Sequence, residues 1–309
     1  MIYIGIALPH LINNKLPNYD SPKQLRAFLE ERGLGMRKKH GQNFLINPAA
    51  RSKLLAALEL RPGDKVWEIG PGLGAMTAGL LERGGQVTAF EIDPAFALAL
   101  REFFEHDSAF RLVEGDALKT WPKVAVDEGE LFLFGNLPYN IAAALLADFI
   151  EKGRFFTRLV VTVQREVAQR MTAKPGSKDY SSFSVLCSSV YKVSPLSVIK
   201  PSAFYPAPRV DSQGVRLDLE TGREKLPKLF YPLVRSLFSS RRKTIKNTLT
   251  VFVSSVIIGK QGASPSPAVI VAELLSRAGI SGDRRPETLG IDEFAALAAF
   301  LEEIISDER

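Results

Sequence analysis

The feature that most constrains this chain is a short apolar segment that runs directly into a glycine-rich turn. Residues 66–69 are apolar except for one glutamate, and Gly70, Gly72 and Gly74 follow at every second position. Glycine lets a backbone take left-handed conformations and approach a ligand closely, and the N-terminus of a following helix favours negative charge. This pattern predicts a strand, a ligand-binding turn and a helix at residues 73–83.

The segments after this turn alternate between strand and helix patterns. Further strands are expected at residues 86–92, 110–114, 131–134, 159–163, 190–198 and 215–219, and helices at residues 94–105 and 141–152. Residues 131–134 are all apolar, which is typical of a strand that is buried on both faces. Strands and helices of this length in alternation predict an α/β fold with a doubly wound, mostly parallel sheet.

The strand patterns stop near residue 220, and helices are expected after it at residues 229–238, 244–256, 269–278 and 292–305. Near the other end, Ser21-Pro22 and Asn47-Pro48 each pair a capping side chain with proline, which indicates the start of a helix. We therefore predict an N-terminal arm at residues 1–20, an α/β domain at residues 21–220 and a small all-α C-terminal domain at residues 221–309.

Composition excludes several classes of protein. The 309 residues are 46% hydrophobic and 24% charged, which does not fit a disordered, collagen-like or polytopic membrane protein. Cys187 is the only cysteine and there are three histidines, so we expect no metal and a reducing, cytoplasmic compartment. No uninterrupted apolar stretch is long enough to cross a membrane, and no signal peptide is recognised, so no membrane association is expected.

The positive charge is unevenly distributed. The formal net charge is +6, and residues 223–260 hold nine Lys or Arg against a single acid. A second basic cluster lies at residues 37–40. Segregated positive charge favours a polyanionic partner such as a nucleic acid. The candidate RNA-binding residues are Arg37, Lys38, Lys39, Arg241, Arg242 and Lys243.

Two acidic side chains follow the next strands and complete a nucleoside site with the glycine turn. Glu91 ends one strand, where a carboxylate can accept hydrogen bonds from both ribose hydroxyls. Asp116 follows another, where it could accept from an adenine amino group. Open α/β sheets bind ligands at these carboxyl ends of their strands. The turn also satisfies the dinucleotide pattern, so on its own it does not separate NAD from S-adenosyl-L-methionine.

A second motif, Asn136-Leu137-Pro138-Tyr139, ends a buried strand in the same region. An exocyclic aromatic amine is a poor nucleophile because its lone pair is delocalised into the ring. The Asn136 side-chain oxygen and the Leu137 carbonyl can accept its two N–H bonds, which favours a tetrahedral nitrogen whose lone pair is aimed at a methyl sulfonium. Pro138 fixes the turn, and Tyr139 offers a face for the target base.

The order of motifs along residues 21–305 resembles the ribosomal RNA adenine N6,N6-dimethyltransferases, and most of all the small-subunit branch of that family. The motifs that carry this resemblance are Gln42-Asn43-Phe44-Leu45, Glu68-x-Gly70-x-Gly72-x-Gly74, Glu91-Ile92-Asp93, Gly115-Asp116, Asn136-Leu137-Pro138-Tyr139 and Phe204-Tyr205-Pro206-Ala207-Pro208-Arg209-Val210-Asp211-Ser212. The resemblance implies a Rossmann-like class I methyltransferase with a seven-stranded sheet. It also implies S-adenosyl-L-methionine as methyl donor, and as substrate two adjacent adenosines in the 3′-terminal hairpin loop of 16S rRNA, within a partly assembled small ribosomal subunit. The enzyme is expected to be monomeric and to take part in ribosome biogenesis.

The resemblance also implies roles for the matching positions. Tyr139 and Phe204 would sandwich a flipped adenine, since stacking on aromatic faces offsets the cost of extruding a base. The residues expected to carry catalysis are Asn136, Leu137, Pro138, Tyr139 and Phe204. The residues expected to bind the donor are Asn43, Leu45, Gly70, Gly72, Glu91, Asp116 and Asn136.

Three other functions remain open on the residues alone. A large-subunit rRNA dimethyltransferase of the macrolide-resistance type shares the whole catalytic set, although the segment 208–212 and the basic C-terminal domain favour the small-subunit enzyme. A dinucleotide-dependent oxidoreductase would have no use for the Asn136–Tyr139 motif. A non-catalytic assembly factor on the same scaffold would not need an intact Asn136 and glycine turn.

Overall fold

The computed structural model describes residues 16–35, 42–125, 129–137, 141–222, 225–257 and 265–307. Packing divides the chain into two compact units. The first consists of Met1–Phe149, Arg154–Ala168 and Val193–Leu219, and the second of Ile150–Gly153, Gln169–Lys192 and Glu220–Arg309. The chain therefore enters the second unit before residue 220, which the sequence pattern does not anticipate.

A seven-stranded sheet forms the centre of the first unit, in the order β4-β3-β2-β5-β6-β9-β7. Its strands are β2 (Lys65–Ile69), β3 (Gln86–Glu91), β4 (Phe110–Glu114), β5 (Leu131–Asn136), β6 (Arg158–Gln164), β7 (Tyr191–Ile199) and β9 (Ser212–Leu219). The pairs among β2 to β6 are parallel, and β9 pairs antiparallel with β6. The mostly parallel sheet expected from the sequence is confirmed. Its strand order reverses beside β2, which is where open α/β sheets bind ligands.

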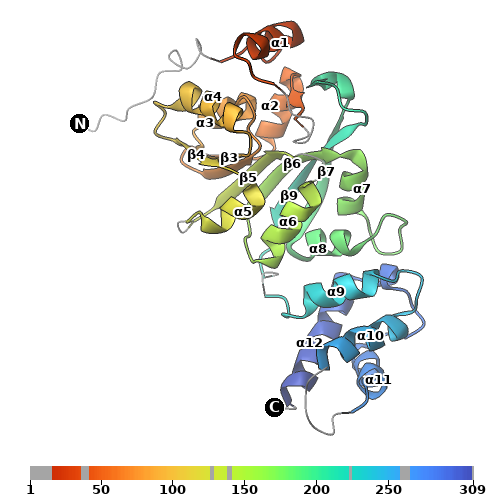
Figure 1. Cartoon of the computed structure of the whole chain (residues 1–309). Coiled ribbons are helices and arrows are strands. Elements are labelled where there is room, and N and C mark those ends of the chain that lie inside the picture. Colours follow the sequence, from red (N-terminus) through yellow and green to blue (C-terminus); the bar gives the residue numbers. More distant parts are fainter. Residues whose placement is uncertain are drawn as a thin grey trace. The chain divides into compact units, whose positions relative to one another are not determined.

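Helices follow the parallel strands and cover both faces of this sheet (Figure 1). They are α3 (Ala75–Glu82), α4 (Pro94–Phe104), α5 (Ala117–Thr120), α6 (Ala142–Glu151) and α7 (Arg165–Thr172). On one face, Leu54 and Leu80 pack with Val66 and Phe132 of the strands. On the other face, Trp67 of β2 packs edge-on against Phe156. Apolar burial of this kind is the main term that holds the layers together.

Two helices precede the sheet, and both begin where the capping pairs predict. The Ser21 side chain accepts from the N–H of Gln24 at the start of α1 (Pro22–Glu31). The Asn47 side chain accepts from the N–H of Ala50 at the start of α2 (Pro48–Ala56). Each cap satisfies an N–H group that the first helical turn leaves without a partner, and proline at the first helical position loses no bond.

A second, two-stranded sheet joins distant parts of the first unit. It pairs β1 (Phe44–Leu45) antiparallel with β8 (Phe204–Tyr205), so that Leu45 lies opposite Phe204. Strands of two residues carry no periodic signal, and the sequence analysis therefore did not predict them. This small sheet places two of the motifs that carry the family resemblance, at residues 42–45 and 204–212, next to each other, although more than 150 residues separate them.

The second unit is helical. It contains α8 (Ser182–Val190), α9 (Phe230–Phe238), α10 (Ile245–Ile257), α11 (Pro267–Ala278) and α12 (Ile291–Asp307). The last four helices agree with the sequence prediction to within two residues at each end. Helix α8 was not predicted, and its residue Val185 is buried in the same apolar cluster as Phe230 and Leu297. The Tyr180 hydroxyl donates to the carbonyl of Leu289 at 2.9 Å, which ties residues before α8 to the C-terminal helices.

Candidate active site

A pocket opens at the carboxyl ends of β2, β3 and β5. Among its lining residues are six of the predicted donor-binding residues, namely Asn43, Leu45, Gly70, Gly72, Glu91 and Asn136. The pocket also includes residues to which the sequence analysis gave no role, namely Gln42, Phe44, Glu68, Pro71, Ala75, Met76, Ile92 and Phe134. The structure therefore gathers four separate sequence motifs around one hollow.

The glycine turn takes the conformation that its sequence predicts. Gly70, Gly72 and Gly74 all have positive φ angles, at 70°, 58° and 84°. A Cβ atom on Gly72 would lie 2.8 Å from the ring of Phe44, so a side chain there would collide with β1. The turn can pass this close to β1 because it carries no side chains at these positions.

Glu91 lies at the end of β3 and is only 4% exposed. One carboxylate oxygen accepts the N–H of Gly72 at 3.0 Å and the other accepts the N–H of Asp93 at 2.8 Å. Burial raises its pKa to about 7, and these two N–H bonds oppose the rise because they favour the charged form. The carboxylate is thus fixed against the glycine turn, with acceptor capacity left for hydroxyl groups of a ligand.

Glu68 is the ionisable residue among those pocket residues for which the sequence predicts no role. It is 1% exposed, and burial raises its pKa to about 8. The Thr77 hydroxyl donates to its carboxylate at 2.6 Å. The signal was present in the sequence, because a glutamate inside an otherwise apolar strand is costly to bury and needs a reason to be there.

Asn136 lies at the end of β5, and its side-chain amide is oriented by the residue that precedes β1. Its Nδ2 donates to the carbonyl of Asn43 at 2.8 Å. No group in the described part of the chain donates to its Oδ1, which leaves that oxygen available as an acceptor. The next residue, Leu137, is 2% exposed and donates its N–H to the Thr162 carbonyl at 3.1 Å. These bonds fix the end of β5 at the pocket.

Three described residues that were predicted to carry catalysis or bind the donor lie outside the pocket lining, namely Leu137, Asp116 and Phe204. Asp116 is the N-cap of α5, where one carboxylate oxygen accepts the N–H of Leu118 at 3.1 Å. Phe204 is 3% exposed and packs with Leu45 in the apolar cluster of the sheet face. A ring this buried would have to be uncovered before it could stack on a base. All three roles stay predictions.

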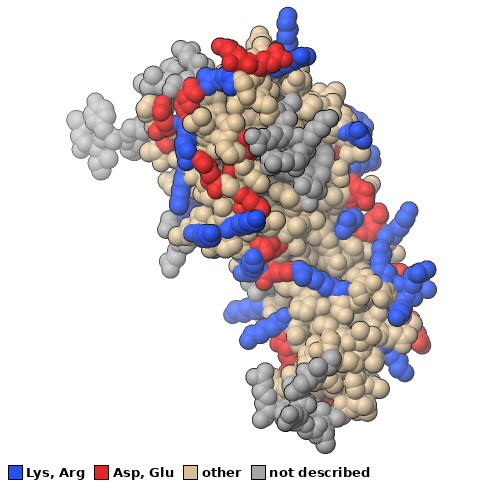
Figure 2. Space-filling view, in the orientation of Figure 1, with Lys and Arg blue, Asp and Glu red and all other residues tan. Residues whose placement is uncertain are grey.

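Five other predicted residues lie outside the described residues, namely Arg37, Lys38, Lys39, Pro138 and Tyr139. The remaining predicted RNA-binding residues lie in the turn between α9 and α10. Arg241 makes an ion pair with Glu287 at 3.7 Å and donates to the carbonyl of Lys178. Arg242 and Lys243 are exposed, and neither makes an ion pair with another described residue. Figure 2 shows Lys and Arg side chains on the surface of both units, with acidic side chains among them.

The pocket has the features that a nucleoside ligand requires. Its backbone approaches closely at Gly72, and its acceptors are the carboxylate of Glu91 and the amide oxygen of Asn136. Within the described ranges, no three His, Cys, Asp or Glu side chains come together as metal ligands. None of the described helices is both long and apolar enough to cross a membrane.

Comparison with known proteins gives matches over most of the chain. Residues 33–258 match the family model for ribosomal RNA adenine dimethylase. The chain is 45% identical over 287 residues to ribosomal RNA small subunit methyltransferase A of Treponema denticola, covering 91% of this chain and 95% of that protein. It is 39% identical to the protein of the same name from Borreliella burgdorferi, over 91% of this chain and 94% of that protein.

Solved structures show the same fold. A dimethyladenosine transferase from Plasmodium falciparum matches with a TM-score of 0.71 and 23% identity, over 84% of this chain and 97% of that one. The 23S rRNA methyltransferase ErmE matches with a TM-score of 0.59 and 23% identity, over 84% of this chain and 99% of that one. At this level of identity, the likeness is one of fold.

Proposed function

The chain belongs to the ribosomal RNA adenine dimethylase family, and from this premise we propose that it transfers methyl groups from S-adenosyl-L-methionine to adenine N6 amines of ribosomal RNA. The proposed targets are two adjacent adenosines in the 3′-terminal hairpin loop of 16S rRNA, so each amine becomes dimethylated. The observation that carries this proposal is the Asn136 amide at the donor pocket, which is oriented by the Asn43 carbonyl and whose oxygen accepts no hydrogen bond from the described residues.

The chain's own groups supply binding and orientation. The donor, when bound, supplies a methyl group on a positively charged sulfur. Glu91, fixed by the Gly72 N–H, would accept hydrogen bonds from the ribose hydroxyls, and the turn at Gly72, which has no side chain, would let the backbone approach the nucleoside. Asn43 and Leu45 close the pocket from the β1 side.

On the substrate side, the Asn136 Oδ1 accepts an N–H of the target amine, and the Leu137 carbonyl accepts the other. Two acceptors on one nitrogen favour a tetrahedral geometry in which the lone pair points at the methyl group. This alignment is a positioning effect, since it holds the reacting atoms in a productive geometry. No general base is needed before the transfer, because the proton can leave afterwards.

The substrate assignment within the family rests on the relatives. The curated relatives that match at 38–45% identity bear the name of a small-subunit enzyme. The 23S enzyme ErmE shares the fold at 23% identity, which supports no claim about substrate. We therefore favour 16S rRNA over the large-subunit alternative.

Several finer points belong to the same proposal. The substrate is rRNA within a partly assembled small ribosomal subunit, and the enzyme acts as a cytoplasmic monomer that needs no metal. Tyr139 and Phe204 hold the flipped base, and Asp116 binds the adenine of the donor. The RNA phosphates are contacted by the predicted basic residues, namely Arg37, Lys38, Lys39, Arg241, Arg242 and Lys243. Phosphate contacts of this kind supply affinity and salt dependence rather than sequence choice.

The direct test is methyl transfer from labelled S-adenosylmethionine to unmethylated small and large ribosomal subunits, followed by nucleoside analysis. We expect N6,N6-dimethyladenosine on the small subunit alone. Label on large-subunit rRNA would assign the chain to the other branch of the family. Bound donor without label on either subunit would mean that the target is a different RNA.

A further inference from the structure

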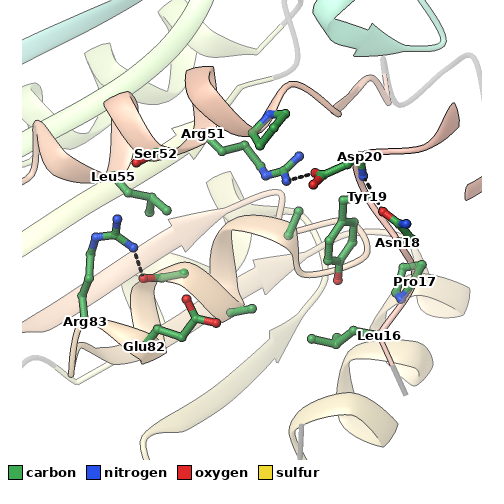
Figure 3. A pocket seen from close by; sticks show the side chains of 14 residues that line it. Leu16, Pro17, Asn18, Tyr19, Asp20, Arg51, Ser52, Leu55, Glu82 and Arg83 are labelled. Carbon is green, nitrogen blue, oxygen red and sulfur yellow. Dashed lines mark hydrogen bonds and ion pairs between the residues drawn. The ribbon is translucent and has the colours of Figure 1, made fainter. Parts of the chain in front are cut away.

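A segment outside every recognised motif makes contact with the back of the donor site. Residues 16–20, here called the N-terminal strap, precede α1 and lie against α2 and α3. Figure 3 shows Asp20 of this strap bonded to Arg51 of α2 at one side of a polar hollow, with Tyr19 beside them and Arg83 on the other side. Two side chains of the strap are hydrogen-bonded, directly or through Arg51, to one backbone carbonyl of the glycine turn and to one of β1, and residues of both segments line the donor pocket.

Tyr19 is bonded to the glycine turn. Its hydroxyl donates to the carbonyl of Leu73 at 2.6 Å, and Leu73 lies between Gly72 and Gly74. The Tyr19 ring packs in the same apolar cluster as Leu73. Burial raises the pKa of Tyr19, so the phenol keeps the proton that this bond requires at every physiological pH.

Asp20 is connected to the opposite wall of the pocket through Arg51. One nitrogen of the Arg51 guanidinium is bonded to the Asp20 carboxylate, and another donates to the carbonyl of Leu45 at 2.9 Å. Leu45 belongs to β1 and lines the donor pocket. The Arg51 guanidinium also lies 5.9 Å from the centre of the Tyr19 ring. The Arg51 side chain is 13% exposed and that of Asp20 is 55% exposed, so solvent screens the Arg51–Asp20 ion pair more than the bond from Arg51 to the Leu45 carbonyl.

We propose that the N-terminal strap is part of the methyl-donor site, with Tyr19, Asp20 and Arg51 as positioning residues. Tyr19 holds the glycine turn, and the Asp20–Arg51 pair holds β1 at Leu45, so the strap fixes the two walls between which the donor binds. The inference rests on the proposed function, because it assumes that this pocket takes the donor.

The physical reason lies in the turn itself. Glycines at positions 70, 72 and 74 make it free to take many conformations, and ordering such a turn on binding costs free energy. The hydrogen bond from Tyr19 to the Leu73 carbonyl orders the turn before the donor binds, so less free energy is spent on ordering it during binding. The donor then meets a preformed site, which favours affinity without any contact to the reacting atoms.

The first test compares Tyr19→Phe with Tyr180→Phe. Both variants remove a phenol that donates to a backbone carbonyl, Leu73 in one case and Leu289 in the second unit in the other. We expect Tyr19→Phe to raise the dissociation constants for S-adenosylmethionine and S-adenosylhomocysteine roughly 2- to 10-fold, which is the value of one hydrogen bond. Tyr180→Phe should lower the melting temperature, because it loses a hydrogen bond of the same kind. It should leave both dissociation constants unchanged.

Kinetics separates positioning from catalysis. In methyl transfer to unmethylated small subunits, Tyr19→Phe should raise the KM for the donor while kcat at saturating donor stays at the wild-type value. Equal donor affinity for Tyr19→Phe and wild type would overturn the inference and leave the proposed function intact. A wild-type chain that binds neither donor nor product would overturn both.

The second test addresses the other wall. Arg51→Lys keeps the charge but loses the planar fork that reaches Asp20 and the Leu45 carbonyl together. Its matched control is Ser52→Ala, since Ser52 is the next residue on α2 and lines the same hollow. We expect Arg51→Lys to raise the dissociation constant for the donor, again roughly 2- to 10-fold. Ser52→Ala should leave this constant unchanged. Unchanged binding in both variants would remove Asp20 and Arg51 from the site.

Discussion

The donor pocket and the turn between α9 and α10 were both singled out by sequence, yet they are built in opposite ways. In the pocket, Glu91 and Glu68 are almost fully buried, and each is bonded to named partners. In the turn, Arg242 and Lys243 are exposed and make no ion pair with described residues. The pocket therefore depends on individual groups, whereas the turn contributes charge that neighbouring cations can replace.

This difference predicts how each region responds to substitution. A buried group with one set of partners has no substitute, so its loss should change binding or rate sharply. An exposed cation contributes through the summed field at the surface, and salt screens it. The following predictions test this contrast, from the largest expected effect to the smallest.

Asn136→Ala should lower kcat for methyl transfer about 100- to 1,000-fold, which is the usual cost of removing one positioned polar group from a reacting centre. The reason is the loss of the side-chain oxygen that Asn136, at the end of β5, offers to the target amine. Single-turnover transfer to small subunits measures the effect. RNA binding should persist, and a rate within threefold of wild type would remove Asn136 from catalysis.

Donor affinity should fall as the solution becomes more acidic than about pH 7. Burial raises the Glu91 pKa to about 7, so below this value the carboxylate gains a proton and loses acceptor capacity for the ribose. The dissociation constant should then rise by up to about tenfold per pH unit, as titration calorimetry between pH 6 and 8.5 would show.

The matched control for this prediction lies on the neighbouring strand. Glu91→Gln should bind the donor weakly at every pH, whereas Glu114→Gln should behave as wild type. Glu114 is the register partner of Glu91 at the end of β4, and it is paired with Arg101 outside the pocket. A wild-type affinity that is flat from pH 6 to 8.5 would contradict the role of the Glu91 carboxylate.

Glu68→Gln should stabilise the chain at alkaline pH. Burial raises the Glu68 pKa from 4.5 to about 8, so the folded chain binds this proton more tightly than the unfolded chain. The contribution to stability is complete below pH 4.5 and is lost as the pH rises towards 8. At pH 8.5, the variant should have a free energy of unfolding about 1–3 kcal/mol higher than wild type, with little difference at pH 5.

Urea unfolding of the donor-free protein at both pH values would measure this. Gln can still accept the hydrogen bond from Thr77, so the geometry of the pair is conserved. The control Thr77→Val leaves the acid without its donor and should destabilise the chain at both pH values. A pH-independent difference between Glu68→Gln and wild type would mean that Glu68 is ionised throughout.

The parts of this fold that the sequence predicts are those where local chemistry admits one solution. Ser21 and Asn47 cap helices, and the glycine turn needs its left-handed residues. Strand-end residues such as Glu91 follow from the register of parallel strands. Asp116 shows the limit of this reasoning, because the same residue type in the same position also caps a helix.

The parts that the sequence does not predict depend on packing between distant segments. The two-residue strands β1 and β8 have no period of their own, and α8 has serines among its apolar residues and so gives no clear stripe. Tyr19 looks like any tyrosine in an irregular segment until the structure places its hydroxyl on Leu73. In each case the determining partner lies more than 40 residues away.

The smallest effect is expected at the turn between α9 and α10. Replacing Arg242 and Lys243 together by Ala should weaken binding to small-subunit rRNA and lower the slope of log affinity against log salt by about 1.4, which corresponds to two phosphate contacts on single-stranded RNA. Filter binding at several salt concentrations measures this slope.

Arg241→Ala is the control, and it sharpens the contrast between the two regions. Arg241 is already ion-paired with Glu287 and hydrogen-bonded to the Lys178 carbonyl, so it has less charge to offer to phosphate. Arg241→Ala should change the salt slope less than the single replacement of Arg242 or of Lys243 by Ala. It should lower the melting temperature instead. If all three single variants shift the slope equally, these partners do not hold Arg241 away from the RNA. If none does, the RNA is bound by cations elsewhere on the chain, and the turn is an ordinary solvated surface.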